Sequence, residues 1–317
     1  MDNVPVLALH DAADPVEIIA GALAAADDDL REALEIYRAH DDMRGLAFAL
    51  SFYAEIARLG GRIDEARARR RQTLDLYLGA PDDDFIVGAR AHSEAILALL
   101  DGDLIGAERA FRRAADGFRR ADRPFMLSIT LGFLADIDER NGHYQVAVDE
   151  LEEAVALAEE LDMRGFVGSL YSRLAWSLAE AGDVTRAALM TNLALDAGRR
   201  LRSPHILFLA HAGSALLHRV QGDNAAAERA ANEALGIHAG EPPSRFRNRI
   251  DPDFEIAAVL AACHTVLGMI AVEHGEAERG AEHVGEADRL RAEVGAPVPS
   301  FQVSDLERAR GALARAE

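Results

Sequence analysis

A glycine recurs along this chain at nearly constant intervals, and this spacing constrains the fold more than any other feature. Each occurrence lies in a short turn, and the six glycines are Gly61, Gly102, Gly142, Gly182, Gly222 and Gly275. Their successive spacings are 41, 40, 40, 40 and 53 residues. Self-similarity at a period of roughly 20–50 residues indicates stacked structural units. The chain is therefore predicted to be an array of similar units.

Small residues repeat in step with the glycines. Seven residues before each glycine stand Ala54, Ala95, Ala135, Ala175, Ala215 and Gly268, and five residues after it stand Ala66, Ala107, Ala147, Ala187, Ala227 and Gly280. Seven residues further on stand Ala114, Ala154, Ala194, Ala234 and Ala287, with Thr73 as the exception. Larger apolar residues such as Leu131 and Leu134 follow helical spacing. Each unit is therefore predicted to be two amphipathic helices that approach closely across a glycine turn.

This pattern resembles the tetratricopeptide repeat family, which has a small residue in the first helix, glycine in the turn and alanines in the second helix. The matches run from about residue 43 to 293, although the family period is about 34 residues and its second-helix aromatic stands only at Phe111. Such long repeats resemble those in the sensor regions of bacterial ATPase-linked transcriptional activators. The resemblance implies an all-α fold, a right-handed α-solenoid of stacked antiparallel helix pairs.

The repeat boundaries suggest three segments. We expect N-terminal helices or a capping repeat over residues 1–42, and six repeats over 43–293 with an insertion loop at 240–254. A C-terminal capping helix is expected over 294–317, because Pro297 and Pro299 precede a further helical pattern.

Charge and composition restrict the partners. Asp and Glu number 54 against 34 basic residues, all of them arginine, so the formal net charge is −20. An acidic surface repels a nucleic-acid backbone and an anionic membrane, and it favours a basic or amphipathic protein or peptide partner. A single cysteine excludes an internal disulfide. With no 18-residue apolar run and no basic start, we expect a cytoplasmic protein without a metal or cofactor.

The resemblance also implies that the first helix of each pair lines a concave groove. The residues carried over to this groove are Phe48, Glu55, Arg58, His92, Ile96, Asp136, Arg140, Ser172, Trp176, Leu216, Arg219 and Met269. They form an apolar floor with charges one turn away, as in grooves that bind ligands or peptides. The longer helices could instead shift the register and place several of these residues in hairpin cores. Trp176, the only tryptophan, is accordingly either a structural residue or a groove residue.

The insertion loop and the histidines leave alternatives open. In the loop, Arg245, Arg247 and Arg249 alternate with apolar residues, so it is either a lid or anion clamp, or a solvated connection. His211 and His218 lie on one helical face, either as hydrogen-bonded interior residues or as a proton-sensitive site.

No enzyme motif stands out, and we predict no catalytic residues. The neighbours Cys263 and His264 point about 100° apart on a helix and therefore do not form a dyad. The function expected is a non-catalytic binding module, an adaptor or regulator whose groove takes a protein segment or peptide. The alternative is a small-molecule sensor with an enclosed pocket near Trp176, and an enzyme is the weaker third possibility. The sequence does not indicate an oligomeric state.

Overall fold

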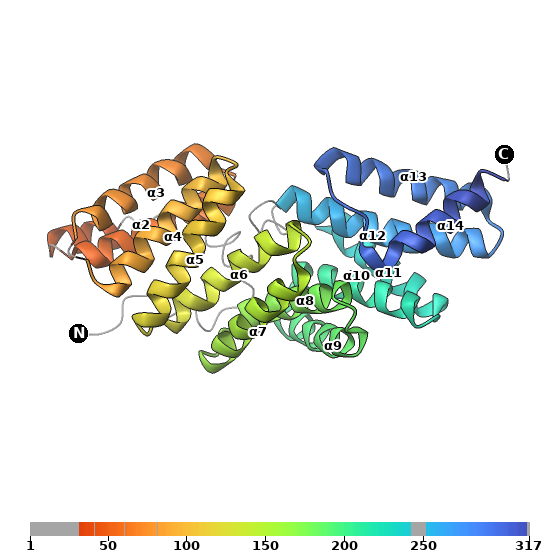
Figure 1. Cartoon of the computed structure of the whole chain (residues 1–317), viewed down its shortest axis with the longest axis horizontal. Coiled ribbons are helices and arrows are strands. Elements are labelled where there is room, and N and C mark those ends of the chain that lie inside the picture. The colour runs from red at the N-terminus through yellow and green to blue at the C-terminus, as the bar shows by residue number, and fades with distance from the viewer. Residues whose placement is uncertain (1–31, 41, 60, 81, 242–251, 316–317) are drawn as a thin grey trace. The chain divides into compact units, whose positions relative to one another are not determined.

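The computed structural model describes residues 32–40, 42–59, 61–80, 82–241 and 252–315. Every regular element in these ranges is a helix, and Figure 1 shows them as a succession of antiparallel neighbours. The chain divides into two compact units, Met1–Val167 and Gly168–Glu317, each considered by itself below. The predicted all-α helical-repeat fold is confirmed.

The first unit is built from three helical hairpins. Its helices are α2 (Met43–Leu59), α3 (Ile63–Leu78), α4 (Asp84–Leu100), α5 (Leu104–Arg120), α6 (Pro124–Arg140) and α7 (Tyr144–Glu160). The pairs α2–α3, α4–α5 and α6–α7 form the hairpins, and α3 packs on α4 as α5 packs on α6. Residues 32–39 form a further helix before α2, whose Leu34 packs in a cluster with Leu46 and Leu50. The rest of the predicted N-terminal segment lies outside the described residues.

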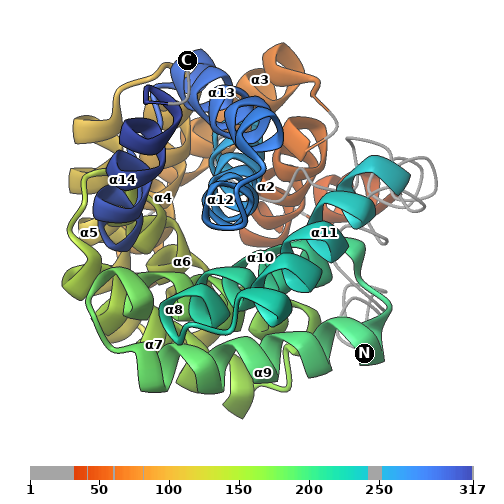
Figure 2. The ribbon, with the colours of Figure 1, turned by 90° about the vertical axis from the view of Figure 1, so that its right-hand side faces the viewer.

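The second unit continues the same pattern. Its helices are α8 (Arg164–Glu180), α9 (Val184–Leu201), α10 (Pro204–Val220), α11 (Asn224–Gly240), α12 (Pro252–Glu273), α13 (Ala277–Val294) and α14 (Val303–Leu313), with a short 3-10 helix, η3 (Ser300–Gln302). In Figure 2, α12 runs between α10 and the pair α13 and α14, and it packs against all three. The helices α10 and α12, which are the first helices of the fifth and sixth hairpins, therefore pack directly on each other.

The turns explain the recurring glycines. All six have a positive φ, between 75° and 88°, which a residue without Cβ adopts at no steric cost. The turns between successive hairpins use other residues in the left-handed region, namely Asp122, Asp162 and Arg202 with φ of 52° to 55°. In these described turns, a left-handed glycine marks the turn within each hairpin, whereas a left-handed aspartate or arginine marks three of the turns between hairpins.

The small residues make close packing possible, as predicted. All the repeated alanines, and Thr73 in the place of one of them, are buried. The two backbones of the α4–α5 hairpin approach closely, since a Cβ added to Gly117 would stand 2.6 Å from the Gly88 Cα. Such a distance leaves no room for any side chain at Gly117.

Aspartates begin several of the helices. The side chains of Asp83, Asp103, Asp183 and Asp223 each accept a hydrogen bond from the backbone N–H three residues later. This pairing satisfies one of the free N–H groups at the helix start. Part of the acidic excess thus serves to define helix ends.

The C-terminal segment packs on the last hairpin. Leu306 and Ala309 of α14 are buried against Met269 and Val284. Gln302 is buried in η3 and donates from Nε2 to the Ala262 carbonyl over 3.3 Å. Buried side chains at these positions anchor the segment to α12 and α13.

One expectation about apolar runs is wrong. The stretch Glu255–Glu273 of α12 is long and apolar enough to cross a membrane by length and composition. Most of it is buried inside the second unit, however, where α10, α11, α13 and α14 surround it. The apolarity of α12 therefore follows from its position as a core helix.

Candidate functional site

In the first unit, the predicted groove residues of α2 form an ion pair. Arg58 donates to Glu55 from Nε over 3.0 Å and from Nη2 over 2.6 Å, so the pair is bidentate. Burial alone would raise the pKa of Glu55, but the Arg58 guanidinium outweighs it and the pKa is lowered. The Arg58 side chain is only 8% exposed, whereas that of Glu55 is 31% exposed. Phe48, two turns earlier, is half-buried against Phe52.

Asp136, from the third repeat, also interacts electrostatically with Arg58. Burial lowers the pKa of Arg58, and the charges of Glu55 and then Asp136 raise it, with a net increase. Asp136 lies on α6 and is buried, while Arg140, one turn further along, is half-buried. Opposite charges on the first helices of the first and third repeats therefore interact with each other.

His92 and Ile96 lie in a different environment, the packed interior of the first unit. Ile96 is 2% exposed and His92 5%. The His92 ring lies 5.3 Å from Phe111 and 5.8 Å from Phe133, measured between ring centroids. Thr130 gives its hydroxyl proton to the Met126 carbonyl, so its oxygen accepts from His92 Nδ1 at 3.1 Å. His92 is thus a neutral interior histidine, and burial lowers its pKa to about 3.

In the second unit, Trp176 and Leu216 meet in one apolar cluster. Leu216 is buried in it, and the half-buried Trp176 packs against it. Ser172, one turn before Trp176, is buried and donates to the Gly168 carbonyl over 3.4 Å. The indole therefore contributes to the packing of α8 while part of its surface stays accessible.

Arg219 is held in a polar network. It donates to Asn224 Oδ1 over 2.6 Å, to Glu273 Oε2 over 2.8 Å and to Asp305 Oδ2 over 3.2 Å. Its side chain is 10% exposed. The network joins α10, α11, α12 and α14, so Arg219 has a structural role in the second unit. Met269, the last predicted groove residue, is buried under α14.

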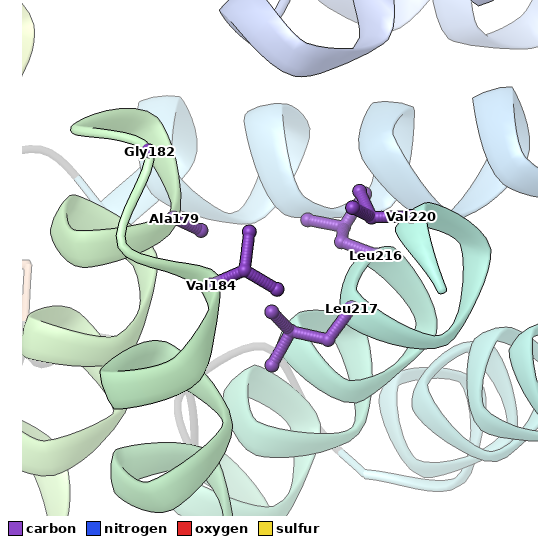
Figure 3. Close-up of a pocket in the computed structure, with 6 residues that line it drawn as sticks. All are labelled: Ala179, Gly182, Val184, Leu216, Leu217 and Val220. Carbon is purple, nitrogen blue, oxygen red and sulfur yellow. The ribbon is translucent and has the colours of Figure 1, made fainter. Parts of the chain in front are cut away.

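An apolar pocket opens between the fourth and fifth hairpins. Its volume is about 100 Å³. Figure 3 shows its lining residues, which are Ala179, Gly182, Val184, Leu216, Leu217 and Val220. They come from the end of α8, the glycine turn, the start of α9 and the last two turns of α10. A cavity lined in this way offers van der Waals contacts and no hydrogen bonds.

A histidine pair was missed by the sequence reasoning. His264 Nδ1 on α12 lies 2.9 Å from His283 Nδ1 on α13, so one imidazole donates and the other accepts. Burial lowers the pKa of both; the His283 imidazole lowers that of His264 further, and the charge of Arg279 lowers that of His283 further. A spacing of 19 residues across a turn gives no sequence signal for such a contact. Among the described residues, no group of three or more His, Cys, Asp or Glu side chains could hold a metal ion.

Two of the remaining candidate residues, His211 and Cys263, lie in the described part of the chain. Burial lowers the pKa of the half-buried His211 and raises that of the Cys263 thiol to about 12. A thiol of this kind is a small core residue with no nucleophilic character at neutral pH. The three loop arginines Arg245, Arg247 and Arg249 lie outside the described residues.

Comparisons with known proteins give the fold. No protein-family model matches the chain, and no curated protein matches it either. The structure of a Rap protein complexed with Competence and Sporulation Factor is similar at a TM-score of 0.52, with 13% identity over 95% of this chain and 87% of that chain. A signal transduction ATPase from Pyrococcus horikoshii with a tetratricopeptide repeat sensor is similar at a TM-score of 0.54 and 14% identity.

The second match covers 94% of this chain and 42% of the ATPase, so this chain corresponds to under half of that protein. Sequence identities of 13% and 14% support a conclusion about the fold alone. The glycine turns, the buried small residues and these two likenesses together show that the chain has the tetratricopeptide-type helical-repeat fold.

Proposed function

We propose that this chain is a non-catalytic protein-interaction module, whose first helices receive a segment of a partner protein. The observation that carries the proposal is the charged cluster of Glu55, Arg58 and Asp136. It joins first helices from two repeats, and the Glu55 carboxylate remains 31% exposed while Arg58 keeps its pKa low. A fixed, ionised acceptor on a rigid helix is suited to a partner's cation or N–H group.

The charge of the chain favours a basic or amphipathic segment. A net charge of −20 attracts such a partner over a distance, and salt weakens this attraction. The two similar structures are consistent with recognition, since one is a complex with Competence and Sporulation Factor and the other carries its repeats as a sensor. Those properties belong to those proteins, and their extension to this chain is part of the proposal.

The pocket between the fourth and fifth hairpins is itself small for a drug-sized ligand. Sites for drug-sized ligands usually enclose roughly 300–1,000 Å³. The pocket beside Leu216 has only about 100 Å³. This pocket therefore suits a single side chain of a protein segment better than a whole small-molecule ligand.

A peptide selection on the full chain tests the proposal. Random 12-residue peptides are displayed, selected on the immobilised protein and measured at low and high salt. We expect basic or amphipathic sequences whose binding weakens with salt and weakens several-fold in Glu55→Gln. The control Asp75→Asn makes the same acid-to-amide change at an exposed position on α3, and should leave binding unchanged. Selection of no sequence, or equal binding by both variants, would refute the proposal.

A further inference from the structure

The pocket between the fourth and fifth hairpins lies at a position that recurs in every repeat. Three of its lining residues have fixed places relative to the turn glycines. Ala179 stands three residues before Gly182, Val184 stands two residues after it, and Val220 stands two residues before Gly222. The same three places can be compared at the next interface along the chain.

At the interface between the fifth and sixth hairpins, polar residues fill these places. They are Arg219, Asn224 and Glu273, and they bond to one another. Arg219 reaches Asn224 Oδ1 over 2.6 Å, and Asn224 Nδ2 reaches Glu273 Oε2 over 2.8 Å. The equivalent crevice is therefore closed by a network of side chains, whereas the crevice one repeat earlier stays open and apolar.

The residue three before each glycine accounts for the opening. Along the six turns these residues are Arg58, Leu99, Glu139, Ala179, Arg219 and Val272. Alanine is the smallest of them, and it stands where five other turns carry a larger side chain. Ala179 thus leaves unfilled the space between Val184 and Leu217 that Figure 3 shows.

The pocket has the size and lining for one aliphatic side chain. An apolar cavity of about 150 Å³ holds a single benzene ring, so about 100 Å³ suits a leucine, isoleucine or valine side chain. Val220 at its edge is 50% exposed, so the pocket can be reached from solvent. An aliphatic side chain seated in a pocket can serve as the buried anchor of a protein interface.

The surroundings of the pocket are acidic. Asp183 lies between the lining residues Gly182 and Val184, and its side chain is 40% exposed. Asp223 is exposed three residues after Val220. Arg186 stands 3.8 Å from Asp183, but the chain as a whole carries a net charge of −20. Basic residues beside the inserted side chain would complement this surface.

We infer that this pocket anchors an aliphatic side chain of a partner protein segment whose neighbouring residues are basic. The inference rests on the proposed function, because it gives the interaction module a specific contact and a kind of partner. It differs from the charged cluster of the first unit in both its place and its chemistry.

Labelled eight-residue peptides test the inference on the full chain by fluorescence anisotropy. One peptide has a central leucine between arginines, a second has alanine in place of the leucine, and a third has glutamates in place of the arginines. We expect the first to bind at least tenfold more tightly than either of the others. Tenfold is about 1.4 kcal/mol, less than full burial of a leucine side chain provides.

Two variants close the pocket in different ways. Val220→Phe covers its mouth, and the triple variant Ala179→Arg, Val184→Asn, Val220→Glu copies the polar set of the next interface. Both should weaken binding of the leucine peptide at least tenfold. Leu189→Phe is the control, because Leu189 is 56% exposed on α9 and does not line the pocket. Circular dichroism establishes that each variant is folded, and if the triple variant is unfolded, Val220→Phe decides the result.

The failures are distinguishable. Equal binding of the leucine and alanine peptides, binding that survives Val220→Phe, or a preference for the glutamate peptide would overturn the pocket inference. None of these results affects a peptide selected at the charged cluster of the first unit. Failure of the earlier selection to yield any peptide would remove the proposed function itself.

Discussion

Lowering the pH from 7 to 5 should destabilise the first unit by about 2 kcal/mol through one side chain, His92. His92 is 5% exposed, and its Nδ1 donates to Thr130. Burial lowers its pKa from 6.5 to about 3, with a smaller contribution from Arg70, while Glu55 opposes the change. The folded protein therefore keeps this imidazole neutral in a range where the unfolded chain protonates it.

The sign and the size follow from this difference. A histidine with a lowered folded-state pKa binds fewer protons in the native state, so stability falls as the pH drops below 6.5 and stops falling near the folded value of about 3. A pH of 5 lies about 1.5 units below the unfolded-state pKa of 6.5, and each unit is worth about 1.36 kcal/mol, which gives about 2 kcal/mol. The half-buried histidines such as His264 and His283, whose pKa values are also lowered, act in the same direction.

Urea unfolding followed by far-UV circular dichroism at pH 7, 6 and 5 measures the effect. The variant His92→Asn isolates the His92 contribution, because asparagine can still donate to Thr130 and cannot be protonated. Its loss of stability between pH 7 and 5 should be about 2 kcal/mol smaller than that of the wild type. His274→Gln, which removes an imidazole at an exposed position, is the control for the loss of a histidine as such. Equal dependence in wild type and His92→Asn would refute the reasoning.

Three further predictions concern packing and turns, and thermal or urea unfolding checks each of them. Gly117→Ala should destabilise the α4–α5 hairpin by about 3 kcal/mol, because the new Cβ would stand 2.6 Å from the Gly88 Cα. Gly236→Ala is the control: a Cβ at this position would have nothing within 4 Å, so the substitution should stabilise α11 by about 0.5–1 kcal/mol. Arg202→Gly should stabilise the chain by about 0.5–1 kcal/mol, since Arg202 has a φ of 52°. Ala179→Leu should stabilise the second unit by about 1 kcal/mol by filling the pocket, while Ala175→Leu, at a position 4% exposed, should destabilise it. Any of these changes with the opposite sign would contradict the packing described for its site.

The repeat architecture was readable from the sequence because it depends on backbone requirements. A turn with φ near 80° needs glycine, and two helices in close contact need small residues at fixed places. Both requirements leave a mark at a constant interval, and Ala95 and Ala107, each 0% exposed, illustrate it. The between-hairpin turns left no such mark, because Asp122 and Arg202 adopt the left-handed region without being glycine.

The sequence did not predict which of the groove residues are exposed and which are buried. Glu55 and His92 were both carried over to one groove, but the structure leaves the first partly exposed and buries the second among aromatic rings. Phe111 lies in the second helix of the second repeat. The equivalent position of the first repeat holds Arg70, which is buried and donates to the Ser51 carbonyl over 3.2 Å. Such substitutions of a charge for a ring change the packing around them. Their consequences depend on neighbours in other repeats, which a local pattern does not reveal.

The pocket, by contrast, could have been predicted from the sequence, because Ala179 is smaller than the equivalent residues of the other repeats. Ala179 stands at a turn position where the next repeat has Arg219. A comparison of equivalent positions, as opposed to a search for functional residue types, would have indicated an unfilled crevice. In a repeat protein the informative residue is often the one that is smaller than its counterparts, because the missing atoms leave a space.

Modularity explains how one chain can carry both a closed and an open crevice. Each hairpin packs mainly on its neighbours, so a change at one interface leaves the next interface intact. The network of Arg219, Asn224 and Glu273 fixes the fifth hairpin against the sixth, while the interface with the fourth hairpin stays incompletely filled. An apolar pocket lowers stability, because its walls lack contacts that a filled interface would have. Its walls regain those contacts when a partner side chain enters, so the space that weakens the free protein contributes to the stability of the complex.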